Sequence, residues 1–103
     1  MDTERIKKLI KNSPIKPGVY IFKDKKKTSI YIGKALNLKN RLTSYLKPIN
    51  DRISAMIDDA ASLEIISTQS DIEALILESR LIKERRPRFN IAMRDDKQYF
   101  YVV

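Results

Sequence analysis

The sequence predicts one small domain of mixed α and β structure, in the α/β class and of the α+β kind. Its 103 residues suit a single domain. Two short runs of β-branched and aromatic residues, GVYIFK and TSIYIG, are typical of β-strands, whereas much of the remaining chain places apolar residues at helical spacing. Hydrophobic residues make up 43% of the chain, which is enough for a packed core.

A helix and a hairpin are the first predicted elements. The helix is expected over residues 4–12, where the apolar side chains share one face. The runs at 18–23 and 28–33 flank a charged tip and predict the hairpin. A two-residue tip places Tyr20 opposite Tyr31, with both phenols on one face and the aliphatic side chains on the other: Val19, Ile21, Ile30 and Ile32. A longer loop at the tip is the alternative, because the Asn-Gly or Asp-Gly pair that favours tight turns is absent.

Two helices and a third strand are expected next. Asn37 can cap a helix over residues 38–46, which would pack inward through Leu38, Leu42 and Leu46. A helix at about 50–60 would bury its apolar side chains, namely Ile53, Met56 and Ile57. Residues 63–67 (LEIIS) predict a short strand.

A long helix is expected from Ser70 or Asp71 to about Arg86, where a proline stops it. Its inward stripe would consist of Ile72, Leu75, Ile76 and Ser79. Glu78 would lie at the border of that stripe and could face a cleft. Residues 95–103 suggest a loop followed by a strand, and an end in mid-strand suggests a fragment of a longer protein.

Missing residue types exclude several kinds of chemistry. The two glycines, Gly18 and Gly33, are too few for the loops that cradle phosphates in dinucleotide-binding and P-loop proteins. With no Cys and no His, thiolate nucleophiles, His-based triads and Cys- or His-bound metals are excluded. Catalysis must therefore use carboxylates, Lys, Arg, Tyr or hydroxyls. A metal ion must be held by oxygen, which favours Mg²⁺ or Mn²⁺.

Charge is distributed in blocks along the chain. The formal net charge is +8, with +10 over residues 1–50, −6 over 51–79 and +4 over 80–103. A basic balance of this size predicts a polyanionic partner, either nucleic acid or an anionic membrane; a solvated basic surface is the alternative. No apolar run approaches the roughly 20 residues that a membrane-spanning helix requires.

The candidate functional residues are polar or aromatic side chains in unusual positions. Tyr20 and Tyr31 each have a glycine two positions away, and glycine in a strand usually marks a bulge or a close backbone approach. Arg41 and Tyr45 share one helix face and Lys34 precedes that helix, a combination that suits a phosphate.

Two further candidates lie later in the chain. Glu78 is a lone acid among apolar helix neighbours, and Asn90 follows a basic run. Every candidate also has an ordinary alternative: core packing for the tyrosines, a solvated face for the basic residues, an ion pair for the glutamate and a turn for the asparagine.

Taken together, four stretches resemble the GIY-YIG nuclease domain, most closely that of UvrC-type proteins. They are PGVYIFKD, YIGKALNLKNRLTSYL, DIEALILESRLIKERRPRFNI and DDKQY, in the family's order and spacing, and they cover nearly the whole chain. Gly18-Val19-Tyr20 stands for the GIY triplet, and Tyr31-Ile32-Gly33 matches YIG. The resemblance implies a GIY-YIG endonuclease domain over residues 1–103, with a central three-stranded antiparallel sheet flanked by helices.

The resemblance also implies chemistry: water attacks a phosphodiester and one DNA strand is cut, with one divalent ion, Mg²⁺ or Mn²⁺, as cofactor. Glu78 would be the metal ligand, Tyr31 the general base, and Arg41 the group that stabilises charge on the scissile phosphate. The remaining positions would shape and polarise the site: Tyr20, Lys34, Tyr45 and Asn90. The DNA backbone would contact Lys34, Lys39 and Arg41.

A UvrC-type domain would make the incision 3′ of a lesion in nucleotide excision repair, in the cytoplasm. Its partners would be damaged double-stranded DNA and UvrB, the latter through segments outside these residues. The domain would be a monomer without membrane contact, and alone it would cut poorly or not at all. Two alternatives remain open: a stand-alone GIY-YIG nuclease that acts on structured DNA, and a non-catalytic nucleic-acid-binding module of the same fold.

Overall fold

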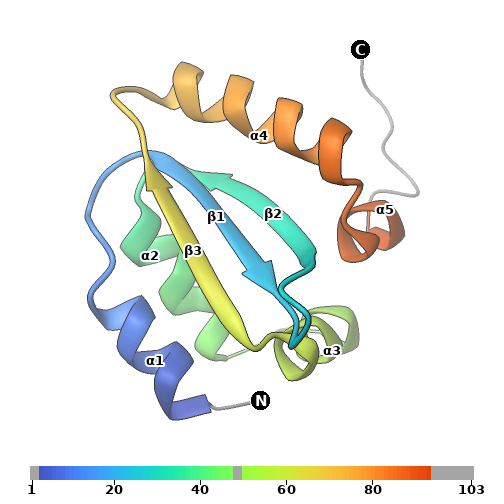
Figure 1. Cartoon of the computed structure of the whole chain (residues 1–103). Coiled ribbons are helices and arrows are strands. Elements are labelled where there is room, and N and C mark those ends of the chain that lie inside the picture. Colours follow the sequence, from blue (N-terminus) through green and yellow to red (C-terminus); the bar gives the residue numbers. More distant parts are fainter. Residues whose placement is uncertain (1–2, 48–49, 94–103) are drawn as a thin grey trace.

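The computed structural model describes residues 3–47 and 50–93 (Figure 1). In these residues the elements are α1 (Thr3–Lys11), β1 (Gly18–Lys23), β2 (Ser29–Ala35), α2 (Leu38–Thr43), the 3₁₀ turn η1 (Ser44–Leu46), α3 (Asp51–Asp59), β3 (Ser62–Ser67), α4 (Asp71–Arg85) and α5 (Arg88–Met93). The strand predicted within residues 95–103 lies outside the described residues.

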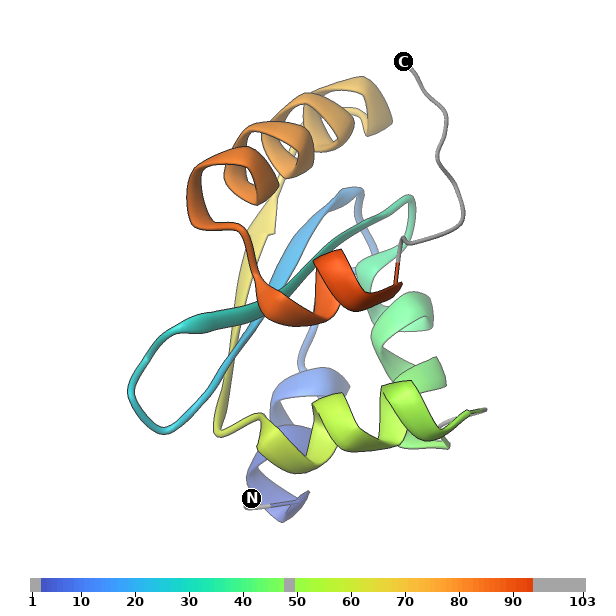
Figure 2. The ribbon, with the colours of Figure 1, turned by 90° about the vertical axis from the view of Figure 1, so that its right-hand side faces the viewer.

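The predicted three-stranded antiparallel sheet is confirmed, with strand order β2-β1-β3. The central strand β1 is almost entirely buried, because helices cover both of its faces. Figures 1 and 2 show α4 on one side of the sheet and α1, α2 and α3 on the other. None of the helices formed by the described residues has the length and apolar character that crossing a membrane demands.

The hairpin register differs from the one that a two-residue tip would give. Tyr20 pairs with Gly33, and Phe22 pairs with Tyr31. The tip is longer, because the Asp24 backbone N donates to the Thr28 carbonyl (3.0 Å) and the Asp24 carboxylate accepts from the backbone N of Thr28 (3.0 Å). The shift amounts to two residues, so the prediction that Tyr20 and Tyr31 share one face is confirmed, at a ring-centroid distance of 6.2 Å.

One aliphatic position of the hairpin was assigned to the wrong face. Val19, Ile21 and Ile32 pack together on the α4 side, as predicted, but Ile30 belongs to the core on the opposite side. The ladder between β1 and β2 shifts register after Phe22, and such a bulge reverses the alternation of side chains.

The helix predicted over 38–46 changes type before its end, which corrects the role given to Leu46. Asn37 caps α2 as predicted, its side chain accepting from the Asn40 backbone N (3.0 Å). Leu38 and Leu42 are buried, whereas Leu46 is 39% exposed and Tyr45 is buried instead. In a 3₁₀ turn three residues complete one turn, so the position below Leu42 falls at Tyr45 rather than at Leu46.

The inward face of α4 is not the predicted one. Ser70 caps the helix, but Ile72, Leu75 and Ile76 are exposed, and the residues that pack on the sheet are Ala74, Leu77, Leu81 and Ile82. Apolar residues lie on nearly all sides of this helix, so spacing alone does not identify the buried face. Glu78 therefore lies beside the packed face of α4, and not at the border of the stripe that was predicted.

A short helix, α5, follows α4 and was not predicted. Arg86 ends α4 in the left-handed conformation (φ 46°), and the buried Pro87 precedes α5. Asn90 thus lies in a helix rather than in a turn. Six residues are too few to show a helical period in the sequence.

Candidate active site

The open edge of β2 is the foundation of the site. β2 is an outer strand, so the backbone N–H groups of alternate residues point away from the sheet. Two of these, at Ile32 and Lys34, donate to side chains from later helices: the Ile32 N to Asn90 Oδ1 (2.7 Å), and the Lys34 N to Glu78 Oε2 (2.9 Å). Two predicted site residues thus occupy the place that a fourth strand would take.

Asn90 holds α5 against β2 through both ends of its amide. Besides accepting from the Ile32 N, its Nδ2 donates to the Ile32 carbonyl (2.8 Å). The side chain is buried, at 8% exposure, and Figure 2 shows α5 beside β2. A buried amide that satisfies both backbone groups of one residue acts as a brace for the YIG strand.

Glu78 is oriented toward β2 by the Lys34 backbone N. Its second carboxylate oxygen, Oε1, accepts no hydrogen bond from the described residues. Burial raises the pKa of this carboxyl, and the charges of Lys34 and Arg41 partly offset that effect. A half-buried carboxylate with one fixed and one free oxygen is suited to bind a cation.

The three predicted tyrosines converge on the face of the sheet that α1, α2 and α3 cover. The hydroxyls of Tyr20 and Tyr45 are 2.6 Å apart, and the Tyr31 ring lies 6.2 and 6.4 Å from theirs. Arg41 Nε donates to Tyr20 Oη (3.3 Å), and the same hydroxyl shares a hydrogen bond with the Tyr45 hydroxyl. We call these four residues the tyrosine–arginine cluster.

The glycines of the two triplets make this packing possible. A Cβ at Gly33 would overlap the Tyr20 ring and hydroxyl. A Cβ at Gly18 would lie 2.5 Å from the Ile66 carbonyl on β3 and 2.7 Å from Leu38 Cδ1. The close approach expected from glycine in a strand is therefore confirmed at both positions.

Burial keeps the phenols of the cluster protonated. It raises the pKa of Tyr20 to about 12, and it raises the pKa values of Tyr31 and Tyr45 as well. The positive charge of Arg41 lowers all three pKa values, but by less than burial raises them. At neutral pH each group is a phenol, and accepting a proton would require further positive charge nearby.

The two predicted lysines have different surroundings. Lys34 Nζ forms an ion pair with Asp71 Oδ1 (2.9 Å), at the start of α4. Asp71 was not among the predicted site residues, because no local sequence pattern relates two residues 37 positions apart. Lys39 lies two residues before Arg41 on α2, about 200° around the helix, and the structure does not bring it into the site.

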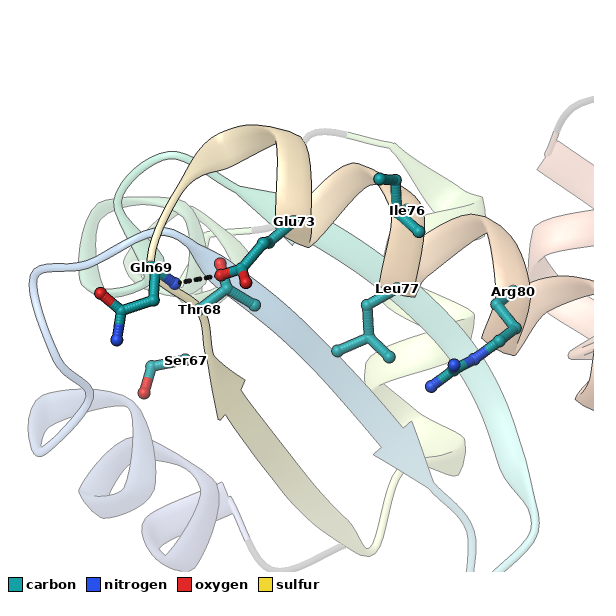
Figure 3. A pocket seen from close by; sticks show the side chains of 7 residues that line it. All are labelled: Ser67, Thr68, Gln69, Glu73, Ile76, Leu77 and Arg80. Carbon is teal, nitrogen blue, oxygen red and sulfur yellow. Dashed lines mark hydrogen bonds between the residues drawn. The ribbon is translucent and has the colours of Figure 1, made fainter.

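Two hollows differ in their relation to the site. One, of about 420 Å³, lies beside the tyrosine–arginine cluster and is lined by Lys34, Ala35, Leu36, Asn37, Asn40, Arg41 and Ser44. The other, of about 360 Å³, lies between the end of β3 and α4 (Figure 3). It contains none of the predicted site residues, and its Glu73 accepts from the Gln69 backbone N (2.7 Å).

The donor set at β2 fits a hard divalent cation. Among residues 3–47 and 50–93 no three acidic side chains come together to form a complete cage. Mg²⁺ needs no such cage, because it commonly keeps several waters and binds one or two carboxylates together with substrate phosphates. The free Oε1 of Glu78 is a carboxylate oxygen of the kind that this ion binds.

The sheet, its two glycine triplets and the carboxylate at its edge are characteristic of one class of enzyme, the GIY-YIG endonucleases. A family model described as the UvrC-like GIY-YIG domain matches residues 16–91, and the chain belongs to this family.

Curated relatives and solved structures agree with this assignment. The chain is 49% identical over 96 residues to UvrABC system protein C of Carboxydothermus hydrogenoformans, covering 90% of this chain and 16% of that protein. It is 46% identical to the protein of the same name from Streptococcus pneumoniae strain D39, covering 94% and 16%. The chain thus spans about one-sixth of the length of these relatives.

A solved structure shares the fold. It is the GIY-YIG N-terminal endonuclease domain of UvrC from Thermotoga maritima, bound to its catalytic magnesium ion. It matches with a TM-score of 0.82 and 48% identity, over 84% of this chain and 97% of that one. Variants of that domain with one tyrosine changed to phenylalanine, or an asparagine changed to alanine, are also similar and also carry the catalytic cation.

Proposed function

We propose that this domain cuts one DNA strand by metal-assisted attack of water on a phosphodiester, leaving a 5′-phosphate and a 3′-hydroxyl. The cut lies on the 3′ side of a lesion in nucleotide excision repair. The observation that carries the proposal is an oriented carboxylate on Glu78 that lies close enough to the tyrosine–arginine cluster to interact electrostatically with Tyr31 and Arg41. The relatives named UvrABC system protein C support the assignment to repair.

Glu78 holds the single divalent cation, Mg²⁺ or Mn²⁺. Its free Oε1 supports this role, as does the fit of the edge to a hard ion. In the Thermotoga maritima domain, variants lacking one tyrosine hydroxyl or one asparagine amide still carry the cation, so those side chains are not what retains it there. When bound, the cation polarises the phosphate and neutralises charge that develops on it.

Tyr31 takes the proton from the attacking water. Its half-buried hydroxyl lies in the tyrosine–arginine cluster, where burial raises its pKa and the Arg41 charge lowers it. A further positive charge at the edge of β2 would lower that pKa again, which increases the fraction of Tyr31 present at neutral pH as phenolate, the form that accepts a proton.

Arg41 stabilises negative charge on the scissile phosphate. Tyr20 accepts a hydrogen bond from its Nε, which fixes the direction of the guanidinium group while its other N–H groups remain for phosphate oxygens. Tyr45 holds Tyr20 in turn, and Lys34 adds a second positive charge to the hollow of about 420 Å³. Asn90 keeps the strand that carries Tyr31 and Lys34 in place.

In its biological setting the chain is a monomeric, cytoplasmic domain of a longer UvrC-type protein. Damaged double-stranded DNA is the substrate, and UvrB is the partner, bound through segments outside this chain. The short coverage of the relatives supports this arrangement, because most of their length lies elsewhere. On its own the chain cuts poorly or not at all.

The test is incision by a full-length relative that carries this chain in place of its own N-terminal domain. With UvrB, Mg²⁺ and a duplex bearing one lesion, the parent protein cuts on the 3′ side. Tyr31→Phe keeps the ring but removes one hydroxyl, and should slow this cut by about 10²–10⁴-fold. Lys8→Ala, at an exposed position on α1 that is not among the candidate site residues, is the control and should cut at nearly the parent rate.

Folding of each variant is checked by thermal unfolding. A folded Tyr31→Phe variant that makes the 3′ cut at a near-normal rate would contradict the role of Tyr31. Loss of only the 5′ cut would contradict the assignment of this domain to the 3′ side.

A further inference from the structure

An exposed apolar side chain lies inside the hollow that carries the candidate phosphate ligands. Leu36 is 68% exposed and lines this hollow between Lys34 and Arg41. Its backbone is fixed on both sides, because Ala35 is buried at the end of β2 and the Leu38 N donates to the Lys16 carbonyl (3.0 Å). The leucine is therefore presented to solvent from an ordered segment.

The surroundings of Leu36 match a nucleotide better than an apolar protein surface. Apart from the small, buried Ala35, the side chains that share its hollow are cationic or polar: Lys34, Asn37, Asn40, Arg41 and Ser44. The cations suit a phosphate, to which leucine contributes nothing. The apolar parts of a nucleotide that lie next to its phosphate are the deoxyribose and the face of the base.

We propose that Leu36 packs against the deoxyribose and base of the nucleotide next to the phosphate bound by Lys34 and Arg41, so that the site selects DNA in which that base is unstacked. In a regular duplex the base faces are covered by stacking, and a leucine reaches them only where stacking is lost. The inference rests on the proposed function, to which it adds a preference among substrates.

Fluorescence anisotropy over a salt series separates the two kinds of contact. The probes are one labelled duplex that is fully paired and the same duplex with three central unpaired bases. Phosphate contacts set the slope of log K against log salt, at about −0.9 per phosphate, whereas an apolar contact adds affinity that salt does not change. The variants are Leu36→Ser, the control Ile76→Ser on α4, and Arg41→Gln.

The wild type should bind the duplex with unpaired bases more tightly than the paired one. Leu36→Ser should lower the affinity for the unpaired probe by about 3- to 10-fold, at every salt concentration and without a change of slope, and remove the preference. Ile76→Ser removes a similarly exposed side chain (63%) from the hollow of Figure 3 and should have no effect. Arg41→Gln should reduce the slope by up to about 1 on both probes.

The outcomes distinguish this inference from the function on which it rests. Equal loss on both probes with Leu36→Ser, no loss at all, or the same loss with Ile76→Ser would overturn the role of Leu36. An unchanged slope with Arg41→Gln would instead contradict the phosphate site and the proposed function. As a second measurement, Leu36→Trp provides the chain's only tryptophan, whose fluorescence the unpaired probe should quench more than the paired probe; equal quenching would also overturn the inference.

Discussion

On the face of the sheet that α1, α2 and α3 cover, aromatic rings pack together and their hydroxyls lie beside Arg41. On the face that α4 covers, the packed side chains are aliphatic, among them Val19 and Ile21. Glu78 comes from the helix on the aliphatic face. It nevertheless meets the residues of the aromatic face, because it binds the backbone of β2 at the open edge.

The difference shows how a small domain can place an acid near phenols without burying the acid among them. A carboxylate inside the aromatic core would be strongly desolvated and protonated. At the strand edge, Glu78 receives a backbone hydrogen bond and keeps one oxygen free, while the phenols stay in the core. At the edge of β2, a carboxylate from the helix on the aliphatic face therefore lies near the phenols of the aromatic face.

Breaking the brace at this edge should have the largest effect on stability. Asn90→Ala leaves the Ile32 N–H and carbonyl without their partner, and each buried group left unsatisfied costs about 1–3 kcal/mol. Urea unfolding should show a loss of about 2–4 kcal/mol. Asn40→Ala, at an exposed asparagine on α2, is the matched control and should stay within about 0.5 kcal/mol.

The intermediate variant Asn90→Asp sharpens this test. It keeps an acceptor for the Ile32 N–H and loses the donor to the Ile32 carbonyl. A loss as small as that of Asn40→Ala, for both variants at Asn90, would show that the edge of β2 needs no brace.

Alkaline pH should lower the stability of the fold through the aromatic face, because the phenols that ionise lie there and the packed side chains of the other face are aliphatic. The pKa of Tyr20 rises from about 10 in the unfolded chain to about 12 in the folded one, so the folded state favours the phenol. The stability from Tyr20 is therefore fully present below pH 10 and is lost as pH rises from 10 through 12, by about 2–3 kcal/mol. Absorbance of tyrosinate, recorded with circular dichroism, follows ionisation and unfolding together.

Tyr20→Phe is the comparison, because phenylalanine keeps the ring and removes the titrating group. It should unfold less steeply than the wild type above pH 10. Identical alkaline transitions in the two proteins would mean that the Tyr20 hydroxyl is not held in its buried, protonated form.

How much the sequence could predict depends on how local the determining interactions are. The hairpin, the caps at Asn37 and Ser70 and the glycine triplets were predictable, because the deciding residues lie within a few positions of each other. The family resemblance then named Glu78 and Asn90, and the structure places both at the edge of β2.

The wrong predictions concern which side chains are buried, because tertiary packing and not local sequence determines the buried face of a helix. Spacing favoured Ile72, Leu75 and Ile76 for the buried face of α4, but Ala74 lies against the sheet, where its small side chain lets the helix approach closely. Spacing also favoured burial of Leu46, but the change from an α-helix to a 3₁₀ turn exposes Leu46 and buries Tyr45. The Lys34–Asp71 ion pair joins residues far apart in sequence, so no local pattern predicts it.

Glu78, at the edge where the two faces of the sheet meet, is the residue that we propose holds one divalent cation. Titrating Mn²⁺ into the chain, with the free ion followed by electron paramagnetic resonance, measures this directly. The wild type should bind one ion, and Glu78→Gln should bind none in the same concentration range. Glu84→Gln, at an exposed position on the same helix, should bind as the wild type does. Equal binding by the wild type and a folded Glu78→Gln variant would show that Glu78 is not the residue that holds the cation.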